Sequence, residues 1–309
     1  EKLNERVNYY HKPQMAANWN FNINEKAFLA TSAYVSFGNG GGSGPLGIGD
    51  YVTTADGDGY YLKYEPPFTA SGQYDWDLLA DLNAQDMYNI DDGDTTLYPA
   101  GESKHIIRNS VNNHFWTGIL STLKYDFTDN LKLTAGIDGR RYVGEHYREV
   151  RDLVGGDYWV DSKFGESEVG DKIAYWNDGI VTYGGIFAQL EYVKGNWAAF
   201  LGGTLSNTWT KRVDYRSYIS YDDAPVDWED AENNPNVSET LSNFGWNVKA
   251  GANYNINENH NIFINGGAYS RVPFFRFHFL NYKNDVNPDL QNEKIYAAEL
   301  GYGVVNRNF

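Results

Sequence analysis

The chain has 309 residues, a net charge of −16 and no cysteine. The lack of cysteine excludes a disulfide framework and a thiolate metal site. The excess of acidic residues opposes binding to a phosphate backbone, so no nucleic-acid partner is expected. Aromatic residues make up 16% of the chain, including 25 Tyr, and such a composition favours strands and turns over helices.

Alternation of apolar and polar residues is the main pattern along the chain. It predicts about nine strands, at 13–23, 27–37, 114–127, 130–146, 179–193, 196–213, 241–256, 260–271 and 294–305. In the seventh, Phe244, Trp246, Val248 and Ala250 alternate with polar or small residues. That strand runs about 13 residues, whereas an ordinary strand has about 5–6. The length suits a tilted strand that crosses a membrane.

The connections between these strands differ strongly in length. Short turns, such as Asn24-Glu25-Lys26, alternate with long connections, and the first of these separates Phe37 from Asn113. Aromatic residues such as Trp197 and Trp209 bracket small apolar residues, as they do at the two interfaces of a bilayer. We therefore predict an all-β fold, a transmembrane antiparallel up-and-down β-barrel with short periplasmic turns and long outer loops.

The predicted strand number is odd, whereas bacterial single-chain barrels normally have an even number of strands. An open sheet edge is also not viable in lipid. We expect residues 1–309 to be part of one barrel domain that contains further strands.

Strand parity predicts which polar side chains face the lumen of the barrel. These are Asn18, Asn20, Arg140, Gln189, Thr204, Asn247, Lys249, Asn253 and Arg271. They would contact water or whatever fills the pore, or would line a path for a substrate.

The long connections are acidic and aromatic, and 77–87 could form a short helix within the first of them. Four aromatic residues in the loops could stack on a ligand: Trp76, Tyr158, Trp159 and Trp228. They could equally pack the loops against one another, and packing is the favoured interpretation.

Two groups of residues could hold a metal ion. An acidic cluster lacks the EF-hand spacing but could bind Ca²⁺, the alternative being a solvated loop. Its members are Asp222, Asp223, Asp227, Glu229 and Asp230. In addition, two or three of His105, His114, His146 and His278 could converge on a metal or an iron chelate. No other cofactor is expected.

Gly42-Ser43-Gly44-Pro45-Leu46-Gly47 formally matches a dinucleotide-binding glycine motif, but no helix is predicted after it. The glycine run from Gly38 is better explained as the exit from a strand into a mobile loop. No motif of a hydrolase, a metalloprotease or a P-loop enzyme is present, so no enzymatic activity is predicted.

Three stretches of the sequence resemble TonB-dependent outer-membrane receptors of the Bacteroidota type. Residues 8–44, which begin NYYHKPQMAANWNFNINEK, resemble a mid-barrel hairpin of these receptors. YDFTDNLKLTAGIDGRRY at 125–142 is similar to their recurring strand–turn–strand unit. VNPDLQNEKIYAAELGYGV at 286–304 resembles their NP-x-L-x-x-E stretch, although Asn292 stands where a Pro is common.

The resemblance implies part of a barrel of probably 22 strands in the outer membrane of a Gram-negative bacterium, with a plug and a TonB box outside these residues. It implies active import of a scarce nutrient, such as an iron chelate, cobalamin, a glycan or a peptide. The energy would come from the TonB–ExbB–ExbD complex acting on the plug, and a surface lipoprotein could cover the outer loops. Two alternatives remain: a passive porin or structural outer-membrane barrel, and a soluble aromatic-rich carbohydrate-binding β-protein.

Overall fold

The computed structural model describes residues 3–62, 67–91 and 94–305. Its main element is an 11-stranded antiparallel sheet in the order β1-β3-β8-β9-β12-β13-β15-β16-β19, in which β2 also pairs with β3 and β14 with β13. Strands that follow one another in this sheet are neighbours in space, so the predicted all-β, up-and-down antiparallel fold is confirmed. Among the described residues, no helix has both the length and the apolar character needed to cross a membrane.

The long strands match the predicted ones in number and order. β1 and β2 both lie along β3 and together correspond to the first predicted strand. The bounds are β1 (Asn8–His11), β2 (Gln14–Asn24), β3 (Ala27–Gly47), β8 (His105–Thr128), β9 (Leu131–Asp152), β12 (Lys172–Lys194), β13 (Trp197–Asp214), β15 (Leu241–Asn257), β16 (His260–Arg271) and β19 (Glu293–Val304).

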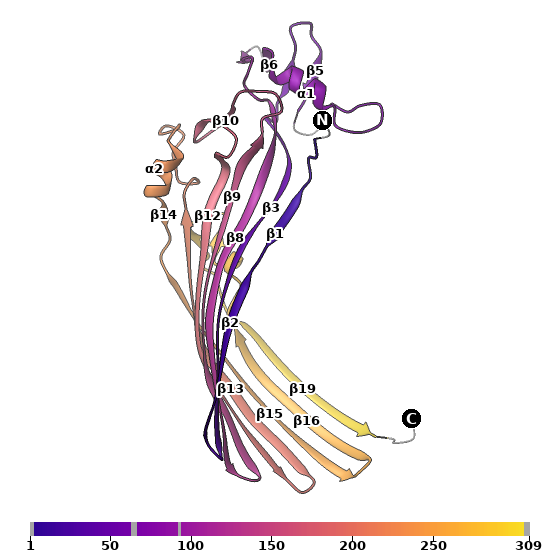
Figure 1. Cartoon of the computed structure of the whole chain (residues 1–309), viewed down its shortest axis with the longest axis vertical. Helices are drawn as coiled ribbons and strands as arrows, with labels where there is room; N and C mark the ends of the chain where they lie inside the picture. Colours follow the sequence, from indigo (N-terminus) through magenta and orange to yellow (C-terminus); the bar gives the residue numbers. More distant parts are fainter. Residues whose placement is uncertain (1–2, 63–66, 92–93, 306–309) are drawn as a thin grey trace.

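Tight turns join the strands at one end of the sheet, which we call the turn end (Figure 1). Side-chain acceptors stabilise these turns. The Asn24 side-chain oxygen accepts from the backbone N–H of Lys26 at 2.8 Å, and the Thr128 hydroxyl oxygen accepts from that of Leu131 at 3.1 Å. Gly195 adopts a φ of 58°, a conformation that favours glycine. The longer connections all lie at the opposite end, the loop end.

One face of the sheet carries apolar side chains that nothing in the described chain covers. Ile137, Ile186 and Leu205 are neighbours on three adjacent strands, and each is more than half exposed. A water-soluble protein rarely exposes a continuous apolar surface of this kind. We call this the apolar face.

Aromatic pairs bracket the apolar face. Trp197 and Tyr254 lie near the turn end with ring centroids 4.6 Å apart, and Phe37 and Phe115 lie farther along with centroids 5.3 Å apart. From Phe115 to Tyr125, β8 advances roughly 25 Å along the barrel axis, given about 3.3 Å per residue and a tilt of about 40°. That height matches the hydrocarbon band of an outer-membrane barrel.

The strands next to the first long connection extend farther than predicted. Residues Gly38–Gly47 continue β3 and pair with β8, so the prediction of a mobile loop there was wrong. Glycines gave no alternation from which a strand could be predicted. Glycine is required at some of these positions because aromatic rings from neighbouring strands occupy the space that a Cβ atom would need. A Cβ on Gly40 would lie 2.1 Å from the Tyr10 ring, and one on Gly38 would lie 2.2 Å from the His114 ring.

The first long connection folds into a small unit of its own. It holds the sheet β5-β4-β6-β7 and one helix. The bounds are β4 (Tyr51–Thr53), β5 (Gly59–Tyr61), α1 (Trp76–Asn83), β6 (Met87–Asp91) and β7 (Asp94–Tyr98). The Asp75 carboxylate accepts from the Leu78 N–H at 3.1 Å and caps α1, whose Leu79 and Leu82 are buried. The helix predicted at 77–87 is therefore present but ends earlier, because Met87 belongs to β6.

The other long connections contain only short elements. These are β10 (Trp159–Asp161), β11 (Gly165–Ser167), α2 (Trp228–Asn233), β14 (Asn236–Val237), a 3₁₀ turn at Phe275–Phe277, β17 (Phe279–Leu280) and β18 (Asp285–Val286).

The buried Asn83 side chain ties α1 to the barrel strands. Its amide nitrogen donates to the carbonyl oxygens of His105, Leu153 and Val154 at 2.9–3.0 Å. Its oxygen accepts from the N–H groups of Lys104 and His105 at 2.8 and 3.3 Å. One side chain of α1 thus satisfies buried backbone groups from two other segments, 104–105 and 153–154.

Two ionisable side chains beside Asn83 are also buried. The Lys104 ammonium donates to the carbonyl oxygens of Gln85 and Pro99 at 2.9 and 2.8 Å, and burial lowers the pKa of Lys104 to about 8. Burial likewise lowers the pKa of His105 to about 4. This effect outweighs the hydrogen bond between Nδ1 and the Leu62 carbonyl oxygen at 3.2 Å, which by itself would raise the pKa. Both residues lie at the loop end, away from the apolar band.

Candidate binding site on the concave face of the sheet

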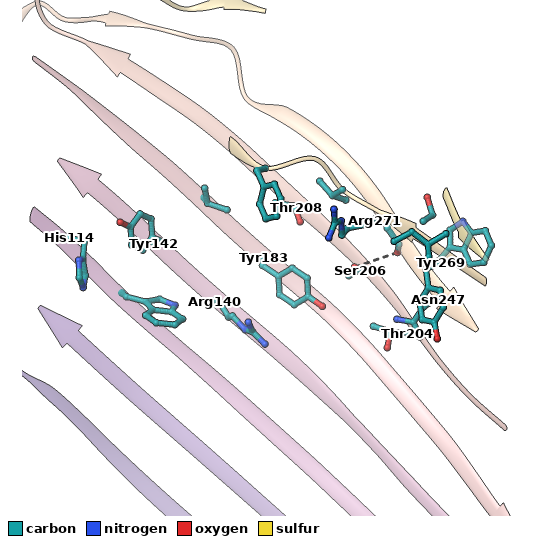
Figure 2. A pocket seen from close by; sticks show the side chains of 18 of the residues that line it. His114, Arg140, Tyr142, Tyr183, Thr204, Ser206, Thr208, Asn247, Tyr269 and Arg271 are labelled. Atoms are coloured by element: carbon teal, nitrogen blue, oxygen red, sulfur yellow. Dashed lines mark hydrogen bonds between the residues drawn. The ribbon is translucent and has the colours of Figure 1, made fainter. Parts of the chain in front are cut away.

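The face opposite the apolar face contains a cavity of about 970 Å³. Its lining comes from strands as far apart as β1 and β16, so the sheet curves around it and this face is concave. Figure 2 shows His114, Arg140 and Tyr183 projecting from successive strands into the same space. The strand register explains this arrangement, because Arg140 on β9 is directly opposite Tyr183 on β12, and Tyr183 is opposite Thr208 on β13.

Three cationic side chains line the cavity, and each lies over an aromatic ring that also lines it. The Lys12 ammonium is 5.3 Å from the centroid of the Trp116 ring. The guanidinium carbons of Arg140 and Arg271 are each 5.3 Å from the ring centroids of Tyr183 and Phe274, respectively. These distances fall within the range of cation–π attraction, which fixes each cation against its ring.

Two of these cations also contact carboxylates. Arg140 donates from Nε to an oxygen of Asp138 at 2.9 Å and makes a second, shorter contact through Nη2. Arg271 contacts Glu293. Within the described part of the chain, Lys12 makes no ion pair. The charge of Lys12 is therefore the least compensated of the three.

A row of three rings, of which His114 and Tyr142 are stacked and Tyr10 is tilted, forms the side of the cavity nearest β1. The His114 ring lies between Tyr10 and Tyr142, with centroids 6.1 and 5.7 Å away. The Tyr10 hydroxyl and Nδ1 of His114 are 3.2 Å apart. Gly38 makes room for the imidazole, as described above. The opposite part of the lining carries hydroxyl and amide groups from Thr204, Ser206 and Asn247 (Figure 2).

The residues predicted to face the lumen all lie on the concave face, but they do not form one cluster. Arg140, Thr204, Asn247 and Arg271 line the cavity. Gln189 and Asn253 line a second cavity of about 400 Å³, nearer the turn end.

Three other predicted lumen residues lie outside both cavities. The strand register connects Asn20 on β2 with Thr204 on β13 through one continuous series of paired residues, so the two side chains lie on the same face of the sheet. Asn18 lies one step along the same face of β2. The Lys249 ammonium is 5.8 Å from the centroid of the Phe200 ring.

The four loop aromatics do not come together at a ligand site. Trp76 packs against the hydrophobic core around Leu79 and Met87. Trp159 is only 7% exposed and packs in a separate core with Ile106, Val150 and Ile173, as the packing interpretation expects. The Trp228 ring centroid lies 4.3 Å from the Lys172 ammonium, and Tyr158 accepts from the Ser103 N–H through its backbone oxygen. These contacts fit the packing interpretation.

The described residues contain no group of three or more acidic or histidine side chains arranged to hold a metal ion. In the predicted calcium loop, Asp227 instead caps α2 and accepts from the Glu229 N–H at 2.8 Å. Asp222, Asp223, Glu229 and Asp230 belong to no such group within the described part of the chain. His105 lies beside Asn83, whereas the His278 imidazole bonds to Asn243 at 3.1 Å, so these two histidines lie apart. His114 and His146 are diagonal neighbours on β8 and β9.

The sequence analysis missed several residues of the cavity, including Lys12, Trp116, Tyr183 and Phe274. Strand parity could have placed Trp116 and Tyr183 on the concave face, because they share it with His114 and Arg140. Lys12 and Phe274 lie outside the long strands, and no periodic pattern indicates where they point.

Comparisons with known proteins identify no family for this chain. No family model matches the sequence, and no curated protein matches it. Among solved structures, the ferric-catecholate import receptor Fiu of E. coli K12 in an open form matches at 12% identity and a TM-score of 0.48. That match covers 86% of this chain and 38% of the other.

The copper transporter OprC matches at 12% identity and a TM-score of 0.49, over 98% of this chain and 43% of its own. The chain thus spans less than half the length of these two proteins. At TM-scores below 0.5, these likenesses do not establish a common family.

Proposed function

We propose that this chain forms part of the wall of an outer-membrane receptor that imports a nutrient into a Gram-negative cell. The observation that carries the proposal is the opposite character of the two sheet faces. One face exposes an apolar band bounded by aromatic pairs, and the other contains a polar and aromatic cavity open to a ligand. A wall of this kind separates lipid from a lumen.

The wall must close if it lies in lipid, because an open edge would leave backbone N–H and C=O groups without partners. The edge strands β2 and β19 would therefore pair with strands beyond this sheet. On this proposal, residues 1–309 belong to one barrel domain. The barrel would be filled by a plug of the same receptor, in agreement with the resemblance of the sequence to TonB-dependent receptors of the Bacteroidota type.

We propose that import is active and is energised by TonB–ExbB–ExbD through that plug. The long connections at the loop end support a receptor rather than a simple pore, because they fold into packed cores instead of mobile loops. A rigid loop end can hold a ligand while a partner on the opposite side acts. A surface lipoprotein over the loop end remains a prediction.

Cell fractionation combined with an uptake assay tests this function. The full-length protein should be found in the outer membrane, and cells that express it should accumulate its nutrient only when TonB is present. The panel to screen contains iron chelates, cobalamin, oligosaccharides and peptides. Accumulation that is independent of TonB would favour a passive porin, and a product in the soluble fraction would favour a carbohydrate-binding β-protein.

A further inference from the structure

We infer that the concave-face cavity binds an anionic ligand that carries several carboxylate-like groups on a flat ring system. This inference rests on the proposed function only in that it takes the concave face to be the ligand-accessible lumen. It starts from the charge of the lining. The cavity is lined by three cations and by no Asp or Glu among the described residues, although the chain as a whole carries a charge of −16.

The three cations are held in separate places. Lys12 lies beside β1 and β8, Arg140 is on β9, and Arg271 ends β16. A ligand with one negative group could reach only one of them. A ligand with several negative groups, spread over a scaffold that fits about 970 Å³, could engage two or three at once. The separation of the cations therefore favours a multivalent anion.

Two of the cations, Lys12 and Arg140, retain groups that can bind an anion. Lys12 has the least compensated charge, as shown above. Arg140 uses Nε and Nη2 for Asp138, which leaves the Nη1 edge of its guanidinium directed elsewhere. Cation–π contacts hold the three groups in position before a ligand arrives, which lowers the entropic cost of binding. Because two cations share their charge with carboxylates, we expect moderate affinity that weakens as salt increases.

The rings of the cavity favour a flat ligand. The His114 and Tyr142 rings are stacked, the Tyr10 ring lies against His114 at a tilt of 43°, and the Trp116 ring lies under Lys12. Aromatic faces gain most from offset stacking on another flat ring. Thr204 and Asn247 can donate hydrogen bonds to oxygen atoms at the ligand's edge. The Ser206 hydroxyl, by contrast, donates to the Gly245 carbonyl oxygen at 3.4 Å. A neutral glycan would use the rings and hydroxyl groups but would have no need for three cations.

Three matched probes separate these contributions in calorimetric titrations of the full-length protein in detergent. Benzene-1,3,5-tricarboxylate has a flat ring and three negative charges. Cyclohexane-1,3,5-tricarboxylate keeps the charges without the aromatic face, and benzene-1,3,5-tricarboxamide keeps the ring without the charges. We expect the aromatic tricarboxylate to bind with a Kd of about 1 mM or below, the cyclohexane analogue to bind several-fold more weakly, and the triamide not to bind.

Adjacent residues on β9 provide a control for the site. Arg140→Gln should weaken binding of the aromatic tricarboxylate about tenfold or more, as expected for loss of a charged hydrogen-bonding partner. Arg141→Gln removes the same charge from the opposite face, because Arg141 is paired with Thr117 and Thr182 on the apolar side, and it should leave binding unchanged. Lys12→Gln tests whether a second cation of the cavity, away from Arg140, also contributes to binding of the aromatic tricarboxylate.

Several outcomes would overturn this inference. They are equal binding of the triamide, equal loss of affinity in the two arginine variants, and no binding of the aromatic tricarboxylate up to about 10 mM. Tight binding of a neutral oligosaccharide at the same site would also overturn it. The titration does not involve TonB, so its failure leaves the import assay unaffected, and TonB-independent uptake would leave the titration result intact.

Discussion

The two ends of this protein are stabilised in opposite ways. At the loop end, buried apolar side chains form cores such as that around Leu79 and Met87, as in a water-soluble domain. In the half nearer the turns, large apolar side chains such as Ile186 and Leu201 are more than half exposed. Strand pairing and a surrounding apolar medium must therefore stabilise that half. The same chain thus follows two rules for placing apolar residues, and its environment decides which rule applies.

The largest expected effect on stability comes from replacing one asparagine at the loop end, with the same replacement in the other region as its control. Asn83→Leu removes the partner of several buried backbone groups and should destabilise the loop end by about 4 kcal/mol or more, since each such group costs about 1–3 kcal/mol. Native-state hydrogen exchange of the α1 amides measures the loss. Asn253→Leu is the control. Among the described residues, the Asn253 side chain bonds to the side chains of Asn255 and Asn261 on the concave face, and its loss should not change exchange in α1.

Truncation of a leucine to alanine should have the next largest effect, and its cost in stability should differ between the two regions. Leu79 is fully buried, so Leu79→Ala leaves a cavity and should cost about 2–5 kcal/mol of local stability. Leu201 is 55% exposed on the apolar face, and lipid can fill the space left by Leu201→Ala. Hydrogen exchange in α1 should therefore rise only in the first variant. A comparable rise in both would contradict the difference between the regions.

The position of the lipid can be tested on β13. Leu201→Arg places a charge on the apolar face and should cost about 2–4 kcal/mol in folding into lipid vesicles. Thr204→Arg places the same charge on the concave face and should be nearly neutral. The free energy of unfolding from vesicles in denaturant measures both. Equal costs would show that the apolar face does not contact lipid.

A smaller effect is expected from pH at the loop end. The pKa of His105 is lowered to about 4, so the folded state prefers the neutral imidazole and the unfolded chain binds the proton first. The stability that the neutral His105 side chain contributes to the folded state is complete above about pH 6.5 and is lost as the pH falls towards 4. Stability of the loop end should be about 1 kcal/mol lower at pH 5.5 than at pH 7.5. Hydrogen exchange of α1 at the two pH values measures this, and His105→Asn should abolish the difference.

The half nearer the turns was largely predictable from sequence, because local alternation of apolar and polar residues determines which face each side chain occupies. Ile186 and Leu190 lie on the apolar face and Gln189 on the other, as their parity requires. The loop end was not predictable in this way. The Gly38–Gly47 strand has no alternation, and the bonds of Asn83 connect segments about 70 residues apart, which no local pattern encodes. The cavity was predicted only in part, because Lys12 and Phe274 lie outside the regular strands.

The tight turns also bear on the order in which the molecule assembles. Each turn brings two long strands together across a few residues, as between Lys194 and Trp197, so every hairpin can form from contacts close in sequence. The loop end must instead bring α1 to a segment that the chain reaches only after four further strands, β6, β7, β8 and β9. Chain closure over such a distance carries a larger entropic cost. We therefore expect the hairpins to form first and the Asn83 contacts to close last, so that the loop end becomes ordered only after the sheet beneath it is complete.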